Sequence, residues 1–244
     1  MRRLAGLAAF LGVTMAAGAA TAQSISVDLG SGGGVTGQIV RLVLLLTVLS
    51  IAPSILVMVT SFTRIVIVLS FLRTAIGLQQ TPPNAVLVSL ALFLTAFVMA
   101  PTLETSWRDG IKPLIEESID EETAIERATA PLRGFMLEQV RGKDLELFVD
   151  LSGIEAPEEI EAMPLRVLVP AFMISELRRA FEIGFLIFVP FLVIDMVVAA
   201  ILMSLGMMML PPVMISLPFK LIFFVLVDGW FLVVGSLVKS FGAG

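Results

Sequence analysis

Two long apolar blocks dominate the chain, and a pair of prolines marks a turn within or just after each block. Residues 39–78 contain only three charges in 40 positions, and residues 183–219 contain only one, Asp195, in 37. Proline has no backbone N–H and ends a helix at or before its own position. The pairs Pro82-Pro83 and Pro211-Pro212 therefore predict the same plan twice: a long helix, a turn and a second long helix.

The expected fold is an all-α membrane protein. Two helical hairpins, residues 39–103 and 171–244, flank an acidic helical domain at 104–170. A helix of 40 residues would be about 60 Å long, whereas a bilayer core needs only about 20 residues. A simple count gives four spans, and the excess length predicts that protein partners cover part of the helices.

The N-terminus has the features of a signal peptide. Arg2 and Arg3 precede a short apolar run at 4–13, and Ala20-Thr21-Ala22 is a cleavage site of the small-residue type. The alternative is an uncleaved anchor. We expect residues 1–22 to be removed and the Gly-rich residues 23–38 to form a flexible leader. The leader, the acidic domain and the C-terminus would then lie on the exported, periplasmic side, and both Pro-Pro turns on the other.

Composition narrows the chemistry. The chain is 57% hydrophobic and has neither Cys nor His. It therefore has no thiolate nucleophile, no Cys/His zinc site and no Ser-His-Asp triad. No phosphate-binding GxxxxGK[ST] motif occurs either. We expect a protein that is not an enzyme and that needs no cofactor, metal or nucleic acid.

The middle of the chain is acidic. Residues 104–166 hold 16 acidic and 7 basic side chains, a net charge of −9, whereas the rest of the chain has a net charge of +4. Helical periodicity is clear over residues 115–140, and shorter helices are expected at 144–154 and 157–163. The candidate buried positions of the first helix are Ile115, Ile119, Ile125, Leu132, Phe135 and Met136.

Isolated charges interrupt the apolar blocks at Arg64, Asp195, Lys220 and Asp228. Such residues are costly in a membrane and normally face a bundle interior, a partner or water. Asp195 and Lys220 lie on the two arms of one hairpin, so they form either a structural pair or part of a conducting path. Glu176, close to two arginines, forms either a local ion pair or a contact between subunits.

Three consecutive methionines, Met207, Met208 and Met209, precede Pro211-Pro212. Methionine is unbranched and polarizable, so it can close around surfaces of changing shape. Three consecutive side chains cannot all point to one side of a helix. The turn is therefore either a soft constriction or lipid-facing filler.

Several motifs, in one order, resemble the FliP family, whose members are core subunits of the flagellar type III export gate. They span residues 39–239 and comprise Pro53-Ser54-Ile55-Leu56, Thr60-Ser61-Phe62-Thr63-Arg64-Ile65, Gln79-Gln80-Thr81-Pro82-Pro83-Asn84, Ser175-Glu176-Leu177, Met207-Met208-Met209-Leu210-Pro211-Pro212, Pro218-Phe219-Lys220 and Asp228-Gly229-Trp230. The acidic domain matches more loosely.

The resemblance implies a ring of about five copies in the bacterial inner membrane at the flagellar basal body. Its partners would be FliQ and FliR, with FlhB and FlhA, and its cargo would be unfolded flagellar proteins. Met207, Met208 and Met209 would form a gasket around the closed pore. The alternatives are a subunit of an ion or proton-coupled transporter or channel, and the homologous subunit of a virulence injectisome.

Overall fold

Helices make up nearly all the regular structure of the computed structural model, and no strand occurs among the residues it describes, 35–154, 157, 159–207 and 210–242. Two helical segments, Asn84–Ile115 and Leu165–Ser204, are long and apolar enough to cross a membrane. Two bent helix pairs raise the number of candidate spans to four. The predicted all-α membrane class is thereby confirmed.

The first helix, α2 (Val35–Val59), begins inside the segment predicted as a leader. The chain divides into two units at Ser50, and the second unit comprises residues 51–244. The described side chains between Ile39 and Leu49 are exposed, although nearly all of them are apolar. Pro53 lies inside α2.

The expected 40-residue helix is divided at Thr60-Ser61 into α2 and α3 (Phe62–Ile76). The Thr60 hydroxyl donates to the Leu56 carbonyl at 2.6 Å, and the Thr63 hydroxyl donates to the Val57 carbonyl at 2.8 Å. These bonds satisfy carbonyls that lose their helical partners at the end of α2. Hydroxyl groups, not a proline, thus mark the break.

Gly77 ends α3 with a φ of 92°, and its N–H bonds back to the carbonyls of Arg73 and Thr74. Glycine adopts this left-handed conformation without steric cost, which suits the residue after a helix. In the turn that follows, the Arg73 guanidinium donates to Asn84 Oδ1 at 2.6 Å and to the Pro82 carbonyl at 3.2 Å. The first Pro-Pro turn is therefore fastened to the helix that precedes it.

The return arm of the first hairpin extends beyond residue 103, where the sequence predicts that this hairpin ends. It begins as α4 (Asn84–Ser106), passes through a π-helical turn, Trp107–Ile111, and ends as α5 (Lys112–Ile115). A Cβ on Gly110 would lie 2.6 Å from the Ala128 nitrogen. A glycine at this position therefore lets the π turn pack closely on the acidic domain.

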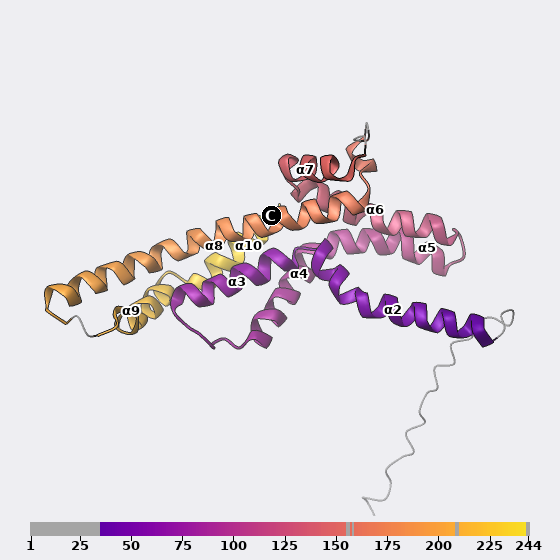
Figure 1. Cartoon of the computed structure of the whole chain (residues 1–244). Helices are drawn as coiled ribbons and strands as arrows, with labels where there is room; N and C mark the ends of the chain where they lie inside the picture. The colour runs from indigo at the N-terminus through magenta and orange to yellow at the C-terminus, as the bar shows by residue number, and fades with distance from the viewer. Residues whose placement is uncertain (1–34, 155–156, 158, 208–209, 243–244) are drawn as a thin grey trace, which may run out of the picture. The chain divides into compact units, whose positions relative to one another are not determined.

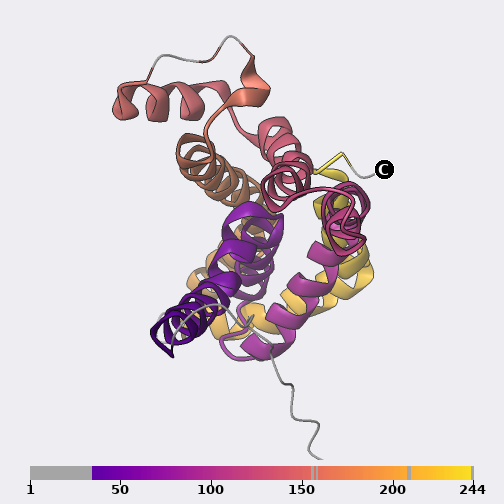
Figure 2. The same cartoon turned by 90° about the vertical axis from the view of Figure 1, so that its right-hand side faces the viewer.

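The acidic domain consists of α6 (Glu121–Gln139), α7 (Gly142–Ser152) and a short 3₁₀ turn, Ile160–Ala162. Phe135 and Met136 are buried and Leu132 is half-buried, but Ile115 and Ile125 are exposed by 66% and 65%. The helix predicted over 115–140 is therefore wrong at its start, because the chain turns at Glu117 (φ 55°) before α6 begins. Figure 2 shows α7 running across α8 rather than along it.

The second hairpin begins with α8 (Leu165–Ser204), a 40-residue helix with Pro170 and Pro190 inside it. The return arm consists of α9 (Pro212–Leu226) and α10 (Gly229–Lys239), which meet at an angle of 63°. Of these, α9 runs back beside α8 (Figure 1).

The main core forms where α3 packs along α8, with α4, α6 and the end of α10 around them. Its fully buried side chains include Ile65, Leu69, Leu168 and Phe172. A smaller cluster, Leu72, Ala75, Ile76, Phe191 and Phe224, lies further along α3 toward the second hairpin's turn. The two hairpins thus share one core instead of packing separately.

Candidate functional site

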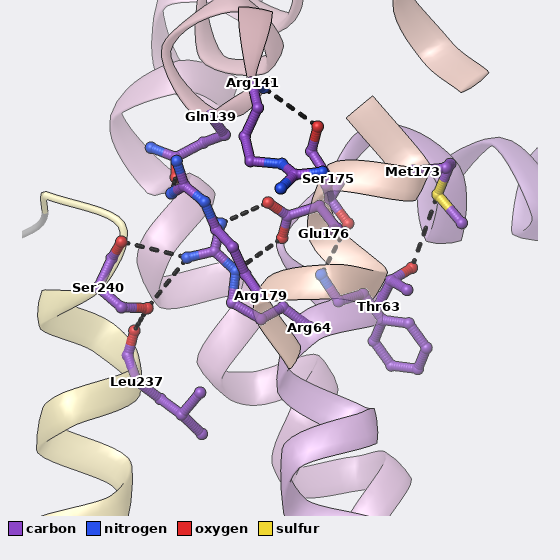
Figure 3. A network of polar contacts seen from close by, with 12 residues as sticks. Thr63, Arg64, Gln139, Arg141, Met173, Ser175, Glu176, Arg179, Leu237 and Ser240 are labelled. Carbon is purple, nitrogen blue, oxygen red and sulfur yellow. Dashed lines mark hydrogen bonds and ion pairs between the residues drawn. The ribbon is translucent and has the colours of Figure 1, made fainter. Parts of the chain in front are cut away.

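A buried ion pair joins the two hairpins. Arg64 on α3 and Glu176 on α8 are both fully shielded from solvent, although 112 positions separate them. Arg64 Nε donates to Glu176 Oε2 at 2.9 Å, and Arg64 Nη2 donates to Glu176 Oε1 (Figure 3). This two-bond geometry is the strongest form of the Arg–carboxylate pair.

The other donors of the Arg64 guanidinium also find partners. Nη1 donates to the Ser240 carbonyl at 3.1 Å and to the Ser240 hydroxyl at 3.0 Å, and Nη2 donates to Gln139 Oε1 at 3.0 Å. The Phe241 ring centre lies 3.7 Å from Arg64 Cζ, within the range of a cation–π contact. Arginine has five N–H donors, so its demand for acceptors is largely met here.

The network continues into the acidic domain. Gln139 Oε1 also accepts from Arg179 Nη1 at 3.0 Å. Ser175, the neighbour of Glu176, donates to Asp144 Oδ2 at 2.6 Å, and Asp144 also accepts from Arg141. Two consecutive residues of α8 thus hold α3 on one side and α7 on the other.

Asp144 lies on α7, outside the candidate spans. Burial opposes its negative charge, but the hydrogen bonds from Ser175 and Arg141 and the positive charge of Arg141 outweigh it and lower the pKa of Asp144. Asp144 is therefore ionised at neutral pH, and the ionised form is the one that its neighbours stabilise.

A second ion pair lies nearer the methionine turn. Lys220 Nζ on α9 is 2.6 Å from Asp195 Oδ2 on α8, and the Ser216 hydroxyl donates to the other carboxylate oxygen. Lys220 also donates to the Ala75 carbonyl at the end of α3, at 3.3 Å. The side chain of Lys220 is 5% exposed and that of Asp195 is 24% exposed. The pair connects the two arms of the second hairpin.

Asp228 has a different environment from the other predicted buried charges. It is exposed, has a φ of 51° and precedes the first residue of α10. Within the single chain it belongs to the break between α9 and α10 and not to a buried network. Its position in an assembly stays a prediction.

The methionine turn begins after α8, where Gly206 has a φ of 74°. Met207 is 48% exposed, whereas Met208 and Met209 lie outside the described residues. Pro211 precedes α9 and Pro212 is its first residue, the helix position where a missing N–H costs nothing. The predicted signal peptide, with Ala20 and Ala22, also lies outside the described residues.

Sequence reasoning missed several members of these networks, among them Gln139, Ser216, Ser240 and Phe241. Each is an ordinary polar or aromatic residue without a motif around it. Ser240 is 176 positions from Arg64, and no local pattern indicates which acceptors a buried arginine will find. Among the residues described, no cluster of three or more possible metal ligands occurs.

The model of the FliP family matches residues 45–237. The flagellar biosynthetic protein FliP of Caulobacter vibrioides is 62% identical over 98% of this chain and 90% of its own length. That of Bacillus subtilis is 57% identical over 83% of this chain and 91% of its own, and that of Aquifex aeolicus is 48% identical over 93% and 96%.

Proposed function

The chain belongs to the FliP family of flagellar biosynthetic proteins, and from this premise we propose that it is a pore-forming core subunit of the flagellar type III export gate. Unfolded flagellar proteins would cross the inner membrane through a ring of these subunits. The observation that carries the proposal is the second hairpin, whose turn combines exposed methionine with prolines at the end of two apolar arms.

Exposed apolar surface supports assembly. In the most apolar 18-residue stretch of α8, only 17% of the residues are buried within the chain. Phe181, Phe185 and Leu186 are exposed by 58%, 66% and 67%. Patches of this kind mark surfaces that meet lipid or another protein. We propose that about five copies and the subunits FliQ and FliR cover them, with FlhB and FlhA nearby.

The gate itself would be the methionine turn. A ring of Met207, Met208 and Met209 side chains would place thioethers at one level of the pore. Thioethers have no charge to attract ions, and their flexible stems can part around a passing chain and close again. Ser216, Asp195 and Lys220 would keep the two arms together while the turn moves.

The placement in the membrane follows from the charges. Residues 183–204 of α8 contain only Asp195, which is paired, and would be about 33 Å long. This length suits a bilayer core. We propose that the acidic domain lies on the periplasmic side and both Pro-Pro turns on the opposite side.

A flagellar system fits the relatives better than a virulence injectisome, because each relative reported above is a flagellar biosynthetic protein. The transporter alternative needs Asp195 and Lys220 as a relay. Both side chains already have partners in the chain, which favours a structural role.

The gate is tested by replacing Met207, Met208 and Met209 with Ala together. Alanine removes the bulk of the seal but is a good helix former, so the hairpin arms should fold normally. Cells that carry this variant should leak ions and small solutes and still assemble the complex and export some flagellar protein. Leak is measured by dye or ion uptake, assembly by blue-native gels and export by secretion assays.

The matched control replaces Met196, Met203 and Met214, which are exposed by 71%, 59% and 66% on the hairpin arms. If those methionines only face lipid or neighbours, their loss should not open the membrane to solutes. Normal impermeability of the triple-alanine turn, with a fully assembled complex, would contradict the gasket.

A further inference from the structure

Both arms of the second hairpin have a weak point in the helix near the same cavity. In α8 the weak point is Pro190, which cannot donate to the Leu186 carbonyl and crowds it. In the return arm α9 and α10 meet at 63°, between Leu226 and Gly229. Helix defects of this kind are where helices bend.

The break in the return arm depends on two residues. Asp228 has a φ of 51°, a conformation that non-glycine residues seldom adopt and that costs free energy unless the surroundings impose it. A Cβ on Gly229 would lie 2.1 Å from the Phe224 ring, so no larger residue fits while that ring keeps its place. The bend is therefore specified by the sequence.

An apolar cavity of about 250 Å³ lies between the two weak points. Pro190 and Phe191 line it from α8, Val227 and Gly229 from the break, and Leu72 from α3. This cavity is open to the surface of the chain, and it gives the Phe224 and Phe191 side chains room to shift when the arms move.

The parts on either side of the break are anchored unequally. Beyond it, α10 leads to Ser240 and Phe241, which contact the buried guanidinium of Arg64. Before it lies the tip, which comprises the described residues 191–207 and 210–226. Among the described residues 192–215 only Leu202 is buried, so few core contacts restrain this end.

The tip contacts α3 in two places: beside the weak points, where Phe191 and Phe224 pack in one cluster with Leu72, Ala75 and Ile76, and at the end of α3. Lys220 donates to the Ala75 carbonyl at 3.3 Å, and a Cβ on Gly77 would lie 3.3 Å from Leu217, which shows how closely the end of α3 approaches α9. The Asp195–Lys220 pair connects the arms within the tip. The tip is therefore braced internally, and its contacts with the body are confined to α3 near the weak points and at the end of that helix.

We propose that Pro190 and the break at residues 227–229 form a paired hinge, about which the tip swings as one braced unit while α3, the base of α8 and α10 stay fixed. The purpose of the motion, to carry the methionine turn away from the pore axis, rests on the export function proposed above. The motion itself does not.

The first test stiffens one arm without adding bulk. Pro190→Ala restores the missing helical hydrogen bond and removes the clash with the preceding turn. Pro170→Ala makes the same change in the same helix, within the body. Both complexes should assemble. Pro190→Ala should lower the export rate several-fold and Pro170→Ala should not.

The second test measures the hinge directly and needs no cargo. The natural chain has no cysteine, so spin labels can be placed at Ser204→Cys in the tip and Ser236→Cys on α10, both exposed. Labelled subunits are diluted with unlabelled ones in the purified complex, and pulsed electron resonance gives the distances within one chain. The distribution should be broad with Pro190 and narrower with Pro190→Ala.

A third variant acts on the other arm. Asp228→Gly keeps the positive φ without its cost, so it should broaden the distance distribution and increase solute leak. The hinge would be overturned if Pro190→Ala and Asp228→Gly both left the distances unchanged, or if Pro170→Ala slowed export as much as Pro190→Ala. Distances that respond as expected in a complex that exports nothing would leave the hinge standing and contradict the export function.

Discussion

The Arg64–Glu176 and Asp195–Lys220 pairs each join α8 to another helix, but they differ in how completely their polar groups are satisfied. Arg64 and Glu176 share two hydrogen bonds, and Gln139, Ser240 and the ring of Phe241 complete the shell. Asp195 is 24% exposed, and Lys220 has one carboxylate and one carbonyl as partners. The first pair fixes the body, whereas the second braces the tip that we propose to move.

Breaking the body pair should have the largest effect. Arg64→Ala leaves Glu176 buried without its partner, a change that costs about 3–5 kcal/mol for a buried pair. We expect the chain to fail to assemble, as measured by blue-native gels and by its level in the membrane. Arg64→Lys should rescue little, because an ammonium cannot reproduce the planar two-bond geometry.

The control for Arg64→Ala is Arg178→Ala, which removes an ion pair with Glu182 whose side chains are 57% and 58% exposed. Exposed pairs contribute at most about 1 kcal/mol. If both variants assembled equally well, the buried Arg64–Glu176 pair would contribute no more to assembly than the exposed Arg178–Glu182 pair, which would contradict the prediction.

Breaking the tip pair should have a smaller effect. Asp195→Asn leaves the nearly buried Lys220 with the Ala75 carbonyl and a neutral amide, a loss of about 1–3 kcal/mol. Assembly should weaken, and adding Lys220→Gln should partly restore it, as expected of residues in contact. If assembly survived Asp195→Asn while export stopped, Asp195 would be a relay instead.

The packing of α8 on α3, between the positions of the two ion pairs along α8, can be tested at Gly184. A Cβ there would lie 2.5 Å from the Phe71 ring on α3, so Gly184→Ala should destabilise by about 1–3 kcal/mol. Gly235 on α10 has no atom within 4 Å of the same position, so Gly235→Ala should stabilise by up to about 1 kcal/mol. Thermal unfolding of the purified complex, monitored by fluorescence, compares the two; equal melting temperatures would contradict a tight α3–α8 contact.

The smallest effect at neutral pH concerns Asp144. Its pKa is lowered in the folded protein, so its contribution to stability is present above the unfolded value of about 3.9 and is lost as the pH falls through the folded pKa. Hydrogen exchange of α7 should therefore stay slow from pH 7 to about 5 and accelerate below about 4 after correction for the intrinsic rate. Asp144→Asn should remove this acid step, and persistence of the step would assign it to another carboxylate.

The apolar pattern indicated the helical membrane class and the apolar arms, because burial in lipid or protein imposes long uninterrupted runs. It did not predict the division at Thr60-Ser61, where hydroxyl groups replace the usual glycine or proline signal. The prediction of which side chains of the acidic helix are buried was partly wrong. Ile115 and Ile125 are apolar but exposed in the single chain, and periodicity cannot distinguish a core position from a surface that an assembly covers.

The charged sites show the same limit. A pair between Asp195 and Lys220 was one of the two predicted alternatives, because one hairpin brings its two arms together, a local constraint that sequence spacing reveals. The partners of Arg64 come from α6, α8 and the segment after α10, and only the packed fold brings them together. Asp228 looked like the other buried charges in sequence, yet its neighbour Gly229 places it at a break.

The contact between Arg64 and Ser240 also limits when the protein can finish folding during its synthesis. Arg64 emerges from the ribosome early, but two of its acceptors are on a residue made 176 positions later. At about 5–20 residues per second, the nascent chain spends on the order of ten seconds with this cation incompletely surrounded. The body can reach its final packing only after Ser240 has been translated, so subunits cut short before this residue would lack its contacts with Arg64.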